Sequence, residues 1–300
     1  MNVKKFFVIL LCTVGVFCAV AGGVLTAKLY AGNDIVQPSD PVKNVDKPTN
    51  NRLNILILGT DGGGLRSDVM ILASLDPKTK SLNMLSIPRD TRVRLNNYYE
   101  KINAALGLGR EDLSIKTVKQ LTGLPIHYYA TVNFDGFKNV IDILGGIDFD
   151  VPQNMNYEDP YQDLYIHLKK GMQHLDGDKA EQFVRFRQYP EGDIARIRAQ
   201  QAFLKALLEQ KLKPSYLTKA SDIYNEMKKN IKTNFTVLDL LKNLSSLQTL
   251  KMENVKMFQL PGAPKNIGGI SYYIQDDQKT LELLEQSFGF DLNSKKSDKK

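Results

Sequence analysis

Three apolar runs of strand length constrain the fold of this chain most. They are Leu53–Leu58, Val69–Leu75 and Ser81–Ile87. None of them alternates strictly between apolar and polar residues, as a strand with one solvated face would. Continuous runs of this kind are typical of strands that are covered on both faces of a sheet. We therefore expect a buried sheet at the start of the folded part of the chain.

Strand and helix patterns alternate along the rest of the chain. Further strands are expected at Pro125–Val132, Ile147–Val151 and Val255–Gln259. Helices are expected at Leu113–Thr122, Phe134–Leu144, Asp193–Leu212, Val237–Leu247 and Asp276–Ser287. The polar, aromatic stretch Met155–Gln162 is expected to lack regular structure. This alternation predicts an α/β fold with a mixed central sheet and helices on both faces, an α/β/α sandwich.

An uncharged run of 22 residues, Phe6–Ala27, lies near the N-terminus. As a helix it would be roughly 33 Å long, enough to cross a bilayer. Lys4 and Lys5 precede it, which predicts a cytoplasmic N-terminus. A cleaved signal peptide is the alternative, since Ala19–Ala21 resembles a cleavage site. The predicted divisions are a cytoplasmic segment 1–5, an anchor 6–28, a stalk 29–52, an extracellular domain 53–292 and a disordered basic tail 293–300.

Composition excludes several functional classes. The formal charge is +7, but no basic recognition helix is present, so no nucleic-acid partner is expected. Cys12 and Cys18 both lie in the uncharged run, so the exported part has no disulfide. His127, His167 and His174 are not at ligand spacing, which argues against zinc.

An arginine-rich stretch follows in the second half of the chain. Val184–Arg187 alternates apolar and cationic residues, which predicts a strand with Arg185 and Arg187 on one face. After a turn, the predicted helix that starts at Asp193 places Arg196 and Gln200 on the same face as Asp193.

Two interpretations of this cluster remain open. Clustered guanidinium groups repel one another unless an anion neutralises them, and their planar fork suits phosphate. Alternatively, Glu181, Glu191 and Asp193 form a lattice of salt bridges with the arginines.

A second polar cluster follows the first and third predicted strands. Gly59–Gly64 is glycine-rich, and Asp61 and Asp68 could share a Mg²⁺ ion with substrate phosphates. The alternative is a capped turn followed by a surface pair of Arg66 with Asp68. Arg89 comes at the end of the third strand and Lys101 soon after. Both could point into the same cleft, or either could form a structural ion pair.

The order of eight motifs resembles the LytR-CpsA-Psr family of bacterial cell-envelope proteins. The resemblance covers about residues 53–212 and the N-terminal anchor topology. The motifs are Asn54–Asp61, Arg66–Asp68, Leu85–Thr91, Lys101–Asn103, Val132–Phe137, Leu144–Ile147, Val184–Arg187 and Gly192–Gln201.

The resemblance implies a membrane-bound phosphotransferase outside the cytoplasm. It would move a glycopolymer, such as teichoic acid or capsule, from polyprenyl (undecaprenyl) pyrophosphate to peptidoglycan and release polyprenyl phosphate. The expected metal is Mg²⁺, or Mn²⁺, and the polyprenyl chain would lie in an apolar pocket. The implied roles are pyrophosphate binding by Arg89, Arg185, Arg187 and Arg196, metal binding by Asp61 and Asp68, catalysis by Asp61 with Arg89, Arg185 and Arg187, and lining of the site by Arg66, Lys101, Asp193 and Gln200.

The chain departs from the family pattern after Arg196. The position of a second family arginine is Ala199, and Arg198 is shifted by one residue, which turns its side chain by about 100° around a helix. Two other functions also remain open. One is hydrolysis of the same lipid pyrophosphate, and the other is a non-catalytic binding or regulatory module.

Overall fold

The computed structural model describes residues 52–60, 65–162, 164–190, 193–211, 231–234 and 252–290, with Gln162, Asp193 and Ile194 described by their backbone alone. The predicted anchor 6–28, the stalk up to residue 51 and the predicted tail 293–300 lie outside these residues. Within the described part of the chain, no helix has the length and apolar character needed to cross a membrane. The described residues form two compact units. We call those of 52–129 and 252–290 the sheet unit, and those of 130–234 the helix unit.

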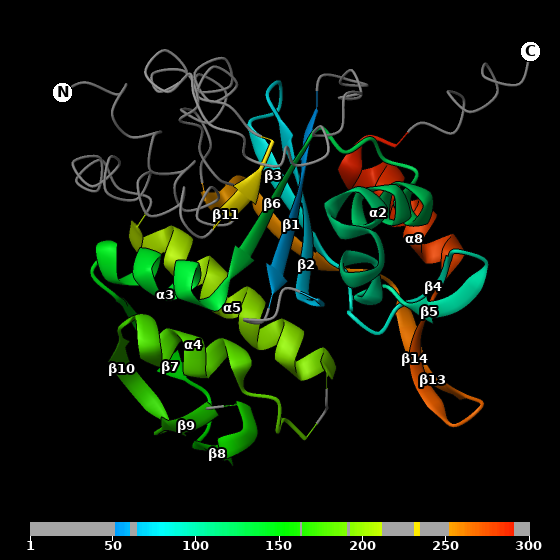
Figure 1. Cartoon of the computed structure of the whole chain (residues 1–300). Coiled ribbons are helices and arrows are strands. Elements are labelled where there is room, and N and C mark those ends of the chain that lie inside the picture. Colours follow the sequence, from blue (N-terminus) through cyan, green and yellow to red (C-terminus); the bar gives the residue numbers. More distant parts are fainter. Residues whose placement is uncertain are drawn as a thin grey trace, which may run out of the picture. The chain divides into compact units, whose positions relative to one another are not determined.

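The sheet unit is built on strands in the order β1-β2-β3-β12. Figure 1 labels β1, β2 and β3. Their bounds are Leu53–Thr60 for β1, Ser67–Asp76 for β2, Ser81–Ser86 for β3 and Val255–Gln259 for β12. The first three are antiparallel neighbours, whereas β12 pairs parallel with β3. The predicted mixed sheet is thus confirmed, and so are the strands predicted at these four places.

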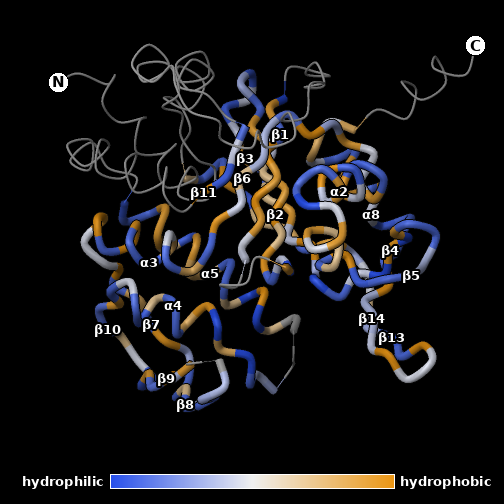
Figure 2. Tube along the Cα trace, in the orientation of Figure 1, coloured by the Kyte–Doolittle hydropathy of each residue, from blue (hydrophilic) through white to orange (hydrophobic). Residues whose placement is uncertain are grey.

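The two faces of these strands are both buried. Leu56, Leu72 and Leu85 align across β1, β2 and β3 and belong to one core cluster. That cluster also contains side chains of α2 (Ala104–Thr122) and α8 (Asp277–Phe288). On the opposite face, Ile55, Ala73 and Met84 are also buried. Figure 2 shows the resulting band of hydrophobic residues along β1 and β2. The uninterrupted apolar runs therefore reflect burial on both faces.

The helix unit contains α3 (Phe134–Ile143), α4 (Gly177–Arg185) and α5 (Asp193–Lys211). β6 (Tyr128–Asn133) pairs antiparallel with β11 (Ile231–Thr233). β7 (Ile147–Val151) pairs with β10 (Gly171–Leu175), and β8 (Met155–Asp159) with β9 (Leu164–Leu168). The helices predicted from Phe134 and Asp193 and the strand Ile147–Val151 are confirmed.

Four phenylalanine rings fill the interior of the helix unit. Phe137, Phe149, Phe183 and Phe203 come from α3, β7, α4 and α5 respectively, and all four are buried. The ring centroids of Phe149 and Phe183 are 4.8 Å apart, and those of Phe183 and Phe203 are 5.6 Å apart. One aromatic cluster therefore holds together elements that are far apart in the sequence.

The predicted strand Val184–Arg187 is wrong, because α4 continues to Arg185. The carboxylate of Asp176 accepts a hydrogen bond from the backbone N–H of Lys179 and caps the helix. Glu181 and Arg185 then form an i,i+4 ion pair on it. Arg185 therefore lies in the last helical turn and Arg187 in the segment after it, so the two do not share a strand face.

The prediction that Met155–Gln162 lacks regular structure is also wrong. Most of it is β8, which forms a hairpin with β9, followed by a short 3-10 helix at Pro160–Gln162. Two more hairpins were not predicted. They are β4 (Arg92–Leu95) with β5 (Tyr98–Lys101), and β13 (Gly262–Ile267) with β14 (Ile270–Gln275). The helix predicted at Val237–Leu247 lies outside the described residues.

Asp76, at the end of β2, should make the stability of the sheet unit depend on pH. Burial raises its pKa. Hydrogen bonds from the backbone N–H groups of Thr79 and Lys78 and the charge of Arg52 together lower this pKa by more, so the net pKa is below 3.8. Such a carboxylate stabilises the fold at pH values above its ordinary pKa. This contribution is lost as the pH falls through the lowered pKa. Asp76→Asn should therefore cost about 1 kcal/mol at neutral pH.

Chemical denaturation at neutral pH and at successively lower pH would measure this difference. The wild type and Asp76→Asn should converge as the pH falls through the lowered pKa of Asp76, where the wild-type carboxyl in the folded protein becomes protonated. Asp150→Asn, at an exposed position of β7, should match the wild type throughout. A constant gap between wild type and Asp76→Asn at every pH would contradict the assignment.

Candidate functional site

Asp68 and Arg89, both predicted site residues, form an ion pair in the sheet unit. Asp68 is the second residue of β2, and Arg89 lies three residues past the end of β3. β2 and β3 run antiparallel, and Ile87 N–H donates to the Met70 carbonyl at 2.9 Å, so the end of β3 lies beside the start of β2. Arg89 Nη1 consequently lies 2.8 Å from Asp68 Oδ1, with side chains 22% and 17% exposed.

The turn after β5 lies beside the pair of Asp68 with Arg89. Asn103 N–H donates to the Arg89 carbonyl at 3.2 Å, and Ser67 N–H donates to the Asn103 carbonyl at 3.4 Å. Lys101 Nζ lies 2.9 Å from Asp90 Oδ1, the neighbour of Arg89. The structure therefore brings Asp68, Arg89 and Lys101 together. We call Asp68, Arg89, Asp90 and Lys101 the charged corner.

The charged corner contains two partly exposed cation–carboxylate pairs. Each cation is held in place by its carboxylate and remains accessible to solvent on one side. A guanidinium group stays positively charged and carries N–H donors in a planar fork that suits a phosphate. Such preformed cations suit an anionic substrate.

Leu65 and Arg66 are the first described residues after Thr60. Leu65 packs its backbone carbonyl so closely on Gly107 of α2 that any Cβ at Gly107 would collide with it. Arg66 is exposed, directly before β2. Asp61 lies outside the described residues, so its predicted place beside Asp68 stays a prediction.

Asp68 is the described member of the predicted metal pair. Within the described ranges, no three His, Cys, Asp or Glu side chains cluster as metal ligands would. Asp68 offers hard oxygen donors, and one of them already accepts a hydrogen bond from Arg89. Mg²⁺ is usually held by one or two carboxylates together with phosphate oxygens and water. The residues present fit this ion only if Asp61 and the phosphates of a substrate complete its ligands.

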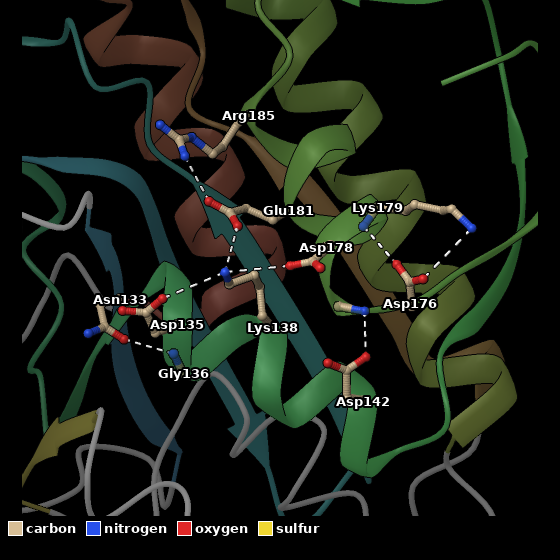
Figure 3. A network of polar contacts seen from close by, with 11 residues as sticks. Asn133, Asp135, Gly136, Lys138, Asp142, Asp176, Asp178, Lys179, Glu181 and Arg185 are labelled. Carbon is tan, nitrogen blue, oxygen red and sulfur yellow. Dashed lines mark hydrogen bonds and ion pairs between the residues drawn. The ribbon is translucent and has the colours of Figure 1, made fainter. Parts of the chain in front are cut away.

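In the helix unit, Arg185 belongs to a network of ion pairs between cationic side chains and carboxylates (Figure 3). Arg185 Nη1 lies 2.7 Å from Glu181 Oε1, and its Cζ lies 4.7 Å from the centre of the Phe134 ring. The other oxygen of Glu181 lies 3.5 Å from Nζ of Lys138. For Arg185, the structure therefore shows the pair with Glu181 from the salt-bridge interpretation, whereas Glu191 and the side chain of Asp193 lie outside the described residues.

Lys138 of α3 is the centre of that network. Besides Glu181, its Nζ lies 3.5 Å from Asp178 and 3.7 Å from Asp135. Burial lowers the pKa of Lys138, but Glu181, Asp178 and Asp135 outweigh burial and raise this pKa above 10.5. Lys138 therefore stays charged at physiological pH and fixes the position of Glu181.

The remaining predicted residues of α5 differ in their surroundings. Arg196 is buried, and its charge partly offsets the burial that raises the pKa of Tyr189 to about 12. Gln200 Nε2 donates to the Val184 carbonyl at 2.9 Å and ties α5 to α4. Arg198 is exposed. Asp193 begins α5. Arg187, which lies between α4 and α5, is exposed.

Arg185→Ala should destabilise the protein even without any ligand. The pair of Arg185 with Glu181 has side chains 18% and 14% exposed, so the remaining carboxylate would be poorly solvated. Because Lys138 still neutralises part of that charge, we expect a loss of about 1–2 kcal/mol in unfolding free energy. Arg187→Ala, at an exposed position two residues away, should cost less than half as much. Thermal melts without ligand measure both, and equal melting temperatures for the two variants would contradict a structural role for Arg185.

Three partners of the candidate site residues were not predicted from the sequence, namely Lys138, Phe134 and Asp90. The i,i+3 spacing of Asp135 and Lys138 is a local signal that could have identified the ion pair within α3. No sequence signal relates Lys138 to Glu181, or Asp90 to Lys101, because helix packing and an unpredicted hairpin bring them together.

Comparisons with known proteins agree on one family. The model of the LytR_cpsA_psr family matches residues 24–288. The polyisoprenyl-teichoic acid–peptidoglycan teichoic acid transferase TagV of Bacillus subtilis (strain 168) is 35% identical over 246 residues, which is 78% of this chain and 63% of TagV. This chain thus spans less than two thirds of TagV.

Solved structures show the same likeness. The crystal structure of B. subtilis TagV superposes with a TM-score of 0.69 and 32% identity, covering 81% of this chain and 100% of that one. The structure of TagT bound to LI-WTA gives a TM-score of 0.65 at 28% identity, covering 82% of this chain and 93% of that one.

Proposed function

Because the chain belongs to the LytR-CpsA-Psr family, we propose that it moves a glycopolymer from a polyprenyl-pyrophosphate carrier to peptidoglycan. The names of its relatives support this proposal. TagV is named a polyisoprenyl-teichoic acid–peptidoglycan teichoic acid transferase, and a solved structure of TagT is described as bound to LI-WTA. A teichoic acid or a similar polymer on an undecaprenyl carrier is therefore the proposed donor.

The reaction would replace one phosphorus–oxygen bond by another. A hydroxyl oxygen of peptidoglycan attacks the phosphorus next to the polymer and forms a phosphodiester. The bond from that phosphorus to the bridging oxygen of the pyrophosphate breaks, and polyprenyl phosphate leaves with the electron pair. The hydroxyl proton passes to a base, a role that we propose for Asp61.

The charged corner is the observation that carries the chemistry. Phosphoryl transfer depends on positioned cations more than on covalent catalysis. Arg89 is such a cation, since Asp68 holds its guanidinium group at 2.8 Å and its side chain is 22% exposed. Lys101 would supply a second positive charge. The proposed roles in binding pyrophosphate or lining the site also extend to Arg66, Arg185, Arg187, Asp193, Arg196 and Gln200.

We also propose a divalent cation, Mg²⁺ or Mn²⁺, with Asp61 and Asp68 as its protein ligands. Bound there, it would neutralise charge that develops on the pyrophosphate. Transfer by the full-length protein should therefore stop in EDTA and return when Mg²⁺ is added. Full activity in EDTA, checked by metal analysis of the treated protein, would contradict this proposal.

The proposed location is the outer side of the cytoplasmic membrane. Residues 6–28 would be the anchor, and residues 53–292 an extracellular domain with helices on both faces of one sheet. A protease added to intact protoplasts should then remove the domain. A domain that stays protected in intact protoplasts, but is cut after lysis, would contradict this topology.

The decisive test of function uses the full-length protein in detergent. It is incubated with Mg²⁺, a polyprenyl-pyrophosphate-linked teichoic acid with radiolabelled polymer, and peptidoglycan. Label bound covalently to peptidoglycan, with release of polyprenyl phosphate, is the expected result. Free labelled polymer would indicate a hydrolase, and unchanged substrate would favour a binding or regulatory module.

A further inference from the structure

The β4–β5 hairpin of the sheet unit presents a cationic face. Cross-strand neighbours in an antiparallel pair lie on the same face. Arg92 pairs with Lys101 and Arg94 with Tyr99, so these four side chains share one face of the hairpin. The alternate residues Val93 and Leu95 are buried in the core. We call Arg92, Arg94, Tyr99 and Lys101 the hairpin face.

The hairpin face carries an aromatic ring in a fixed position. The guanidinium of Arg92 lies 3.7 Å from the centre of the Tyr99 ring and 5.7 Å from that of Tyr272. Tyr272 is buried in the β13–β14 hairpin, whereas Tyr99 is 56% exposed. Arg92 is therefore anchored against Tyr272 on one side and supports Tyr99 in contact with solvent.

The charges on the hairpin face are mostly not compensated within the hairpin. Its only acidic residue, Glu100, pairs across the strands with Val93 and so lies on the other face. Lys101 interacts with Asp90 of the charged corner. Arg94 is exposed, and Arg92 Nε is buried without a hydrogen-bond partner among the described residues. The face thus attracts anions and is continuous with the charged corner through Lys101.

We propose that the hairpin face binds the polyanionic chain of the glycopolymer, at its phosphodiester groups, while the pyrophosphate end reacts. This inference rests on the proposed function. It specifies the substrate class as a polymer with repeating phosphates, in preference to a neutral polysaccharide. Arginine suits phosphodiester oxygens, and an exposed tyrosine ring can pack against a sugar or polyol unit while its hydroxyl group binds neighbouring oxygens.

A membrane surface is a poorer fit for this face. On the hairpin, the large exposed hydrophobic side chains are Tyr98, which is 74% exposed, and Tyr99. The aliphatic residues Val93 and Leu95 are turned into the core and cannot insert between lipids. We therefore take the polymer as the partner and treat lipid binding as an outcome of the test.

The experiment measures binding of the full-length protein, in neutral detergent, to a soluble poly(glycerol phosphate) chain without lipid. Arg94→Glu should weaken binding about tenfold, because it replaces an attraction by a repulsion at one phosphate. Lys116→Glu makes the same charge change at an exposed position of α2 and should leave binding unchanged. Tyr99→Ala should weaken binding about threefold. Neutral dextran of matched length should not bind.

Several outcomes would overturn the proposal. Equal weakening by Arg94→Glu and Lys116→Glu would show only unspecific attraction. Equal binding of dextran would exclude recognition of phosphate. Binding to vesicles of anionic lipid that depends on Arg94, without binding to the polymer, would identify a membrane surface instead. Circular dichroism and thermal melts of each variant exclude unfolding as the cause.

Kinetics separate this proposal from the proposed function. Arg94→Glu should raise the KM for a long lipid-linked teichoic acid about tenfold and leave kcat unchanged. Its KM for a lipid pyrophosphate that carries one disaccharide should equal that of wild type, because such a donor has no polymer phosphates for Arg94 to bind. If wild type transfers both donors and Arg94→Glu is normal with each, the hairpin proposal fails alone. If wild type transfers neither donor, the proposed function fails, and binding of the polymer still tests the face.

Discussion

Arg89→Ala should reduce transfer of the glycopolymer to peptidoglycan by about a thousandfold, chiefly in kcat, because a positioned cation on a transferring phosphoryl group can contribute this much. The structure is consistent with this size of effect, since Arg89 is already oriented by Asp68 at 2.8 Å and its side chain is 22% exposed. The measurement is the rate of attachment of labelled polymer by the full-length protein, with the donor at saturation. A loss of less than about tenfold would contradict a direct role for Arg89.

Two further variants test whether the effect comes from charge or from folding. Arg89→Lys keeps a charge but loses the planar fork, so it should recover only part of the activity. Lys116→Ala, which removes an exposed charge of α2, should be as active as wild type. The stability cost of Arg89→Ala should be about 1 kcal/mol, because the pair with Asp68 is partly solvated. A much larger loss of stability would show that the low activity reflects unfolding.

Phe203→Ala should have the largest effect on stability, a loss of about 4 kcal/mol in unfolding free energy. Phe203 is 1% exposed, and its ring packs against Phe137, Phe149 and Phe183 at centroid distances of 6.1, 5.6 and 5.6 Å. Truncation would leave a cavity between α3, β7, α4 and α5, since their backbones are held by other contacts. Urea denaturation followed by circular dichroism measures the change.

Tyr161→Ala is the matched control for this core substitution. It removes an aromatic ring from the same unit at a position that is 101% exposed, so it should change stability by less than about 0.5 kcal/mol. Phe203→Leu fills more of the space and should recover roughly half of the loss caused by Phe203→Ala. If Phe203→Ala and Tyr161→Ala proved equally stable, the four rings would not form the core of the helix unit.

Local patterns were sufficient for much of the fold. The apolar runs at Leu53–Leu58, Val69–Leu75 and Ser81–Ile87 predicted three central strands, because burial on both faces removes polar positions from a strand. The end of the last helix was within one residue of its observed position, and Asp276 caps its start as an N-cap should. Both signals depend on residues that are close in the sequence.

The arginine stretch shows where local patterns fail. Val184–Arg187 has the period of a strand over only four residues, and the capped helix that begins at Gly177 extends into it. The ion pair of Glu181 with Arg185 and the burial of Phe183 favour the helix. An alternation over only four residues is too short a signal to outweigh them. The backbone at Arg185 is therefore helical where a strand was predicted, although its pairing with Glu181 was one of the two interpretations open from the sequence.

The sequence by itself determined the family, the buried strands and the set of charged residues that we propose for the site, because these are written in residue types and short spacings. The tertiary structure alone decided which charges meet. Arg89 faces Asp68 across 21 positions because β2 and β3 are antiparallel, and Lys138 reaches Glu181 because α3 packs on α4. It also decided that Arg92, Arg94 and Tyr99 share one face, since only the register of β4 with β5 sets that face. Contacts between distant segments depend on how strands pair and helices pack, and no local spacing encodes them.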